Sequence, residues 1–179
     1  MDIVSYSLKL RDLHIKTYRY LRGLIPLPGR PARLTIATSD KEYRGVSKGS
    51  RILEGAAAFM VPGRNQIVLN APRMMSLHGE GTYFNCCTIT HEYIHIAMEN
   101  TDESLVRDSF RLCRRRRDEI CDVVGAQGWS TRRSEELVTI CCEWVYCPHF
   151  RSEEDCGMMD EIGGTFIDLL GWLRPDVGD

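Results

Sequence analysis

The first 24 residues carry hydrophobic side chains at the spacing of an amphipathic helix. Between residues 5 and 24, apolar residues recur at helical spacing at Leu10, Leu13, Tyr18, Leu21 and Leu24, and this pattern predicts a helix with one apolar face. The segment 26–31 contains three prolines and a glycine, and it is expected to end that helix. Residues 34–38 then alternate in the manner of a strand, and a polar stretch follows at residues 39–50.

Two more strands are predicted at residues 56–61 and 66–70, which are rich in apolar side chains. Their connection, Pro62-Gly63-Arg64-Asn65, has the composition of a tight turn. We therefore expect these two strands to form a hairpin.

Helical spacing of the apolar residues returns at residues 83–99, and Asn100 is a suitable stop for this helix. Thr101 or Asp102 can cap a long helix that reaches Val124, after which a glycine-containing segment breaks the pattern. A further helix is predicted from a cap at Ser130 or Thr131 through Cys147, and Pro148 stops it.

A polar, acidic stretch at residues 152–161 leads to a last amphipathic segment at residues 166–173. We find no internal repeat and no low-complexity segment. The whole pattern predicts one α+β domain over residues 1–179. In it, a small, mostly antiparallel sheet packs on the helix at 83–99, and further helices follow.

The composition is that of an ordinary globular protein, with 43% hydrophobic and 27% charged residues and a net charge of −2. This charge gives no general attraction to nucleic acid or to anionic membranes. No apolar run approaches transmembrane length, and the N-terminus is charged and amphipathic, unlike a signal peptide. A cytoplasmic protein without membrane contact is the expectation.

Cysteine is frequent, with eight residues, but no two of them form a C-x-x-C pair. This spacing argues against a zinc ribbon or a thioredoxin-like site. In a chain large enough to fold without disulfides, we expect reduced, buried thiols that act as small hydrophobic side chains.

The most informative chemistry lies at residues 91–95, which form the pattern H-E-x-x-H inside the helix predicted at 83–99. His91 and His95 project from one face of a helix, one turn apart, and can offer two imidazole nitrogens to one metal ion. Glu92 lies about 100° further round the helix, where its carboxylate can reach a metal-bound water. Zn²⁺ is the expected cofactor, since it binds neutral imidazole and keeps an open position for water.

A small sheet followed by an H-E-x-x-H helix resembles the zincin metallopeptidases. The resemblance implies a zinc-dependent hydrolase that cleaves peptide bonds in a protein or peptide substrate. It also implies that an edge strand, here residues 56–61 with 66–70 as its partner, pairs with the substrate backbone. Glu92 would take a proton from the zinc-bound water and pass it to the leaving amine.

A catalytic zinc needs a third protein ligand. The helix that starts near Glu135 resembles the second motif of ImmA/IrrE-type gluzincins, in which a ligand glutamate is followed by small apolar residues and by a proline thirteen positions later. Glu135 and Pro148 have this separation, so Glu135 is the first choice. Glu136 is the alternative, and Glu143 and His149 remain further candidates.

Other features are open to more than one interpretation. Tyr146, His149 and His78 are candidates for stabilising an oxyanion, although each is more often a structural or solvent-facing residue. The run of arginines at 114–117 points all round a helix and is followed by acidic residues, which indicates a solvated surface rather than a nucleic-acid interface.

Three alternatives compete with the gluzincin assignment. A peptide deformylase is disfavoured because its upstream cysteine motif and its glycine-rich loop are absent. A SprT-like protease acting near DNA would use a third histidine, for which His149 is the candidate. A zincin-like zinc-binding module without peptidase activity is the non-enzymatic alternative. ImmA/IrrE-like peptidases typically cleave a helix-turn-helix repressor, so a regulatory protein is the expected substrate, whereas the oligomeric state is left open.

Overall fold

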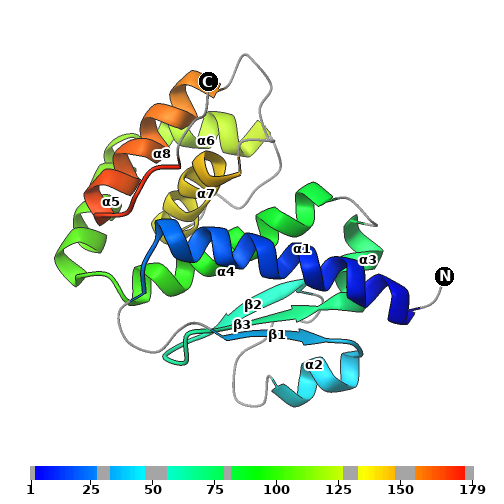
Figure 1. The fold of residues 1–179 in the computed structure, drawn as a ribbon. Coiled ribbons are helices and arrows are strands. Elements are labelled where there is room, and N and C mark those ends of the chain that lie inside the picture. Colours follow the sequence, from blue (N-terminus) through cyan, green and yellow to red (C-terminus); the bar gives the residue numbers. More distant parts are fainter. Residues whose placement is uncertain are drawn as a thin grey trace.

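The computed structural model describes residues 3–27, 33–46, 56–78, 82–126, 133–147 and 156–175. Within these ranges the chain has the predicted α+β architecture, with many helices and one small sheet (Figure 1). The elements follow the order α1 (Ile3–Leu24), β1 (Arg33–Ala37), α2 (Asp40–Val46), β2 (Ala58–Val61), β3 (Gln66–Asn70), α3 (Ala71–His78), α4 (Thr82–Glu99), α5 (Glu103–Arg115), α6 (Arg117–Ala126), α7 (Ser134–Tyr146) and α8 (Cys156–Leu170).

The three strands form a mixed sheet in the order β1-β3-β2. Strand β1 pairs with β3 in parallel, from Arg33↔Gln66 to Ala37↔Asn70, whereas β2 is antiparallel to β3. The expected hairpin is present, and its turn has two residues with positive φ, Gly63 at 68° and Asn65 at 46°. The sheet is therefore not mostly antiparallel as predicted, because the chain returns to β3 beside β1 in the same direction.

Helix α4 is held between the sheet and helix α1. It contacts α1, β2 and β3, while α2 packs against β1 and β3 on the opposite face of the sheet (Figure 1). The side chain of Tyr93 is completely buried, and its hydroxyl donates a 2.9 Å hydrogen bond to the Ile25 carbonyl. Its ring also meets Tyr18 edge-on at 5.7 Å. These contacts fix the rotation of α4 about its own axis, and so determine which of its side chains face away from α1.

Helix α7 is buried from Leu137 to Tyr146 and packs against α4, α5 and α8. Its contact with α8 is very close at Gly163. A Cβ atom there would lie 2.2 Å from the carbonyl oxygen of Cys141 and 2.7 Å from Cγ2 of Val145. Only glycine therefore allows this approach of the two helices.

The long helix predicted to reach Val124 is in fact two helices, α5 and α6. The predicted cap at Asp102 is confirmed, since its side chain accepts a 2.8 Å hydrogen bond from the Ser104 amide. The chain leaves helical geometry at Arg116, where φ is −104° and ψ is 19°. The Arg116 guanidinium bonds Glu119 and, on α8, Glu161. These ion pairs agree with a solvated surface for the arginine run.

Other boundaries differ from the predictions. The polar stretch after β1 contains the short helix α2, and α3 follows β3 directly. Helix α8 begins ten residues before the amphipathic segment predicted at 166–173. The caps predicted at Ser130 and Thr131 lie outside the described residues, as does Pro148, and Arg133 precedes α7 without a side-chain cap. None of the helices in the described ranges is both long and apolar enough to cross a membrane.

Candidate metal centre

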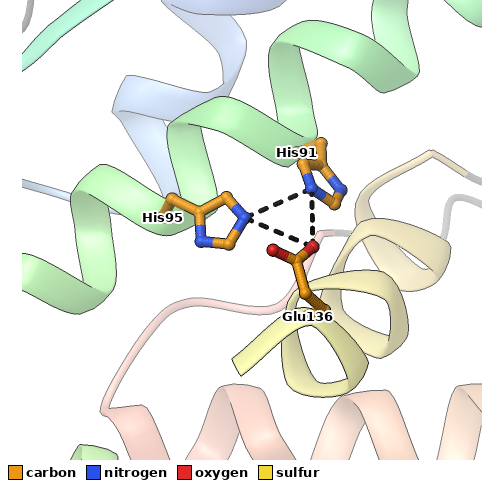
Figure 2. Close-up of side chains that lie close together, drawn as sticks. All are labelled: His91, His95 and Glu136. Carbon is orange, nitrogen blue, oxygen red and sulfur yellow. Dashed lines mark hydrogen bonds and ion pairs between the residues drawn. The ribbon is translucent and has the colours of Figure 1, made fainter. Parts of the chain in front are cut away.

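The H-E-x-x-H sequence lies in α4, and the helix places its two histidines side by side as their spacing predicts. The Nε2 atoms of His91 and His95 are 3.2 Å apart. The carboxylate of Glu136, in the first turn of α7, completes a triangle with these two nitrogens (Figure 2). Its Oε2 atom lies 3.4 Å from Nε2 of His91 and 3.7 Å from Nε2 of His95.

The dimensions of this triangle suit a small metal ion with tetrahedral coordination. A point equidistant from the three atoms lies about 2.0 Å from each of them, and zinc bonds to nitrogen and carboxylate oxygen are about 2.0–2.2 Å long. Bonds of this length at tetrahedral angles separate neighbouring ligand atoms by about 3.4 Å, which is close to the three separations observed. His91, His95 and Glu136 could therefore hold a metal ion together.

Each imidazole is also supported from its other nitrogen. Nδ1 of His91 lies 2.9 Å from Oε2 of Glu143, and Nδ1 of His95 lies 3.1 Å from Oε1 of Glu135. Because an ionised carboxylate only accepts hydrogen bonds, each Nδ1 carries the proton and each Nε2 keeps a lone pair in the neutral ring. This arrangement orients both Nε2 atoms toward Glu136 and increases their basicity.

The charges of the site favour a cation at its centre. Burial lowers the pKa of His91, but hydrogen bonds to Glu136 and Glu143 outweigh this effect and raise the pKa to about 10. For His95, burial likewise lowers the pKa, and bonds to Glu135 and Glu136 raise it to about 9. The pKa of Glu136 is held well below its ordinary value by hydrogen bonds from the two histidines. In the absence of a metal, protons supply the positive charge that the carboxylates stabilise.

Glu92 lies outside the triangle, as its position on the helix predicts. Its carboxylate accepts a hydrogen bond from the backbone N–H of Met60 in β2. Burial raises the pKa of Glu92, while the nearby His91 and His95 lower it in part. A carboxyl group with a raised pKa next to a metal-sized site has the properties of a general base.

The structure distinguishes the two adjacent glutamates. Glu136, the alternative third ligand, enters the triangle, whereas Glu135, the first choice from the sequence, bonds Nδ1 of His95 on its outer side. Glu143, a further candidate ligand, is 2% exposed and supports His91 instead. The supporting role of Glu143 was missed in the sequence, although its position seven residues after Glu136 places both on one face of α7.

Of the remaining candidates, the structure describes the side chain of Tyr146 only. The hydroxyl of Tyr146 donates a 3.0 Å hydrogen bond to the carbonyl of Leu173, which gives this buried side chain a structural role. His149 and the side chain of His78 lie outside the described part of the structure. In comparisons with protein-family models, curated proteins and solved structures, nothing matches this chain.

Proposed function

We propose that this protein is a zinc-dependent metallopeptidase of the gluzincin type, with His91, His95 and Glu136 as ligands. The observation that carries the proposal is the set of three donor atoms around one point, with a carboxylate on the outer nitrogen of each imidazole. Two histidines and one glutamate form a known ligand set of catalytic zinc, and the fourth position remains for water or substrate.

Glu92 is the residue to which we assign the proton transfers. When bound, Zn²⁺ supplies Lewis acidity and lowers the pKa of a water ligand toward 7. The carboxylate of Glu92 takes a proton from the water that attacks the peptide carbonyl and returns it to the leaving amine. Its half-buried position beside the two histidines supports this role, because burial raises the pKa of the carboxyl group above its ordinary value.

The edge of β2 that faces away from β3 is the surface we assign to the substrate backbone. The Asn70 amide bonds the Ala57 carbonyl at 2.8 Å, so the pairs Phe59↔Val68 and Val61↔Gln66 are also hydrogen-bonded and the pairs between them are not. The backbone groups of Ala58 and Met60 therefore point away from β3. An extended peptide can pair by strand addition with the backbone groups of Ala58 and with the carbonyl of Met60, whereas the N–H of Met60 already bonds the carboxylate of Glu92.

The family assignment within the gluzincins remains part of the proposal. With Glu136 as ligand, Pro148 follows after twelve positions rather than the thirteen typical of ImmA/IrrE peptidases. Support for that family therefore comes from the order of the sheet, the H-E-x-x-H helix and a glutamate at the start of a later helix. A cytoplasmic regulatory protein is the substrate this assignment implies.

The decisive experiment separates metal binding from hydrolysis. The purified protein should contain about one zinc ion per chain and should cleave an unbiased peptide library. Glu92→Gln should retain the zinc and lose about 10²-fold or more in rate, while the exposed Glu103→Gln on α5 serves as the matched control. Full zinc retention in a His91→Ala/His95→Ala variant would refute the site. Zinc binding without any hydrolysis would instead favour a non-enzymatic zinc-binding module.

A further inference from the structure

A polar pocket lies at the end of the β2–β3 hairpin, beyond the metal centre. It has a volume of about 580 Å³, and its lining includes side chains from the start of β1, the hairpin turn and the last turn of α4. The residues that matter here are Arg33, Gly63, Arg64, Gln66, Glu99 and Asn100. No group of this pocket takes part in the proposed catalysis.

The pocket has a net positive charge, because its lining contains two arginines and one glutamate. Arg33 and Arg64 are both exposed, and neither forms an ion pair with any carboxylate in the described ranges. Glu99 is the acidic residue of the lining, and one of its oxygens already accepts a 3.1 Å hydrogen bond from the Gly63 amide. Two arginines therefore line one pocket, and an incoming carboxylate could bind their guanidinium groups.

The pocket is placed at a defined distance from Glu92. Strand β2 runs alongside α4 in the same direction, because Met60 donates to Glu92 and Gly63 donates to Glu99. From Glu92 to Glu99 is seven helical residues, and from Met60 to Gly63 is three extended residues. Both distances are about 10 Å, so both hydrogen bonds fit a strand that lies along the helix. The pocket therefore lies about 10 Å past the general base, along the edge that we assign to the substrate.

This distance corresponds to about three residues of an extended peptide. Antiparallel pairing is the more stable arrangement of strands, and a peptide antiparallel to β2 runs from the pocket toward Glu92. Its N-terminal part then lies at Arg33 and Arg64, and the bond to be cleaved lies at the metal centre.

We propose that this pocket is a specificity subsite for an acidic side chain about three residues N-terminal to the cleaved bond. The inference rests on the proposed peptidase function and names a substrate class for it. An extended peptide with a glutamate at that position would bind both arginines through its carboxylate. Partly exposed ion pairs of this kind contribute about a fivefold preference, which salt weakens.

The test uses zinc-loaded Glu92→Gln protein and two fluorescent peptides. One carries a single Glu about three residues before a central bond, and its twin carries Gln. We expect the Glu peptide to bind about fivefold more tightly at low ionic strength. Arg64→Glu should abolish this preference. The control is the exposed Arg115→Glu on α5, which makes the same change in net charge.

Moving the glutamate along the peptide tests the direction of binding. A preference at the mirror position C-terminal to the bond, equal affinities for the two peptides, or no effect of Arg64→Glu would each overturn the subsite. Cleavage of both peptides at the same kcat/KM by the wild-type protein would overturn it as well, and would leave the peptidase function intact. Acid-selective binding together with a complete absence of hydrolysis would keep the subsite and refute the peptidase.

Discussion

The carboxylate of Glu143 lies 2.9 Å from Nδ1 of His91, although the two residues are 52 positions apart in the chain. Glu143 is 2% exposed, and burying a carboxylate is unfavourable unless it is paired. Its contact with the imidazole provides that pairing and fixes the direction in which Nε2 points. The candidate metal centre thus depends on a residue that lies outside its triangle of donor atoms.

Glu143→Gln should test this dependence, because glutamine keeps the volume of the side chain and removes its charge. The amide oxygen still accepts the proton of Nδ1, but the basicity of the imidazole falls. Loss of such an outer partner typically lowers metal affinity about 10- to 100-fold. Competition with a zinc chelator measures the change, and an unaltered affinity would contradict the role assigned to Glu143.

Alanine substitutions at the two adjacent glutamates should have unequal effects. Glu136→Ala removes an atom of the triangle and should abolish stable zinc binding. Glu135→Ala removes only the partner of His95 Nδ1 and should weaken binding about 10- to 100-fold. Titration with zinc, followed by elemental analysis, ranks the two variants. If Glu135→Ala proved the more severe, the ligand would be the residue expected from the sequence.

The stability of the metal-free protein should depend on pH through His91 and His95. Their pKa values in the folded chain, about 10 and about 9, exceed the ordinary value of 6.5. A raised pKa stabilises the fold below the unfolded pKa, and this contribution is lost as the pH rises through the folded pKa. We therefore expect the free energy of unfolding of chelator-treated protein to decline between about pH 6.5 and pH 10.

Urea unfolding at a series of pH values measures this decline. The matched control is His91→Gln/His95→Gln, in which the part due to the histidines should vanish. The stabilisation by added zinc should show the opposite trend and grow as the pH rises toward about 9 to 10, because zinc binds the imidazoles only after Nε2 has lost its proton. A metal-free stability that rose above pH 6.5, relative to the double variant, would contradict the charge assignment.

Gly163→Ala should destabilise the protein through the contact between α8 and α7. The added methyl group would lie 2.2 Å from the Cys141 carbonyl oxygen, and overpacking of a core costs about 1–3 kcal/mol. Gly157→Ala on the same helix is the control, since no atom lies within 4 Å of its added Cβ. Chemical unfolding should show a loss for the first variant only. Equal stabilities would mean that the two helices separate easily.

The sequence was sufficient for the parts of the site that depend on helical spacing alone. His91 and His95 face one way because they are four residues apart, and Glu92 therefore faces another way. The choice between Glu135 and Glu136 depends on the rotation of α7 about its own axis. Helix α7 is buried on all sides from Leu137 onward, so it has no polar stripe from which that rotation could be predicted. Contacts with other helices, such as that at Gly163, determine it.

In the fold, too, local features could be predicted from the sequence and distant contacts could not. The hairpin turn could be predicted because Gly63 and Asn65 are residues that adopt positive φ readily. Helices α2 and α3 have seven and eight residues, which is about two turns and too short for a clear hydrophobic period. The parallel pairing of β1 with β3 brings together strands that are separated by α2 and β2, and no local pattern encodes such a distant contact.

The donor groups are divided between α4 and α7, and this division has a consequence for the stability of the folded chain. Neither helix alone holds a complete ligand set, and the paired residues are 40 and 52 positions apart. A bound zinc ion would therefore act as a crosslink that only the docked helices can form. Cells short of zinc would hold a less stable form of the chain, so that zinc supply would control the lifetime of the protein as well as its chemistry.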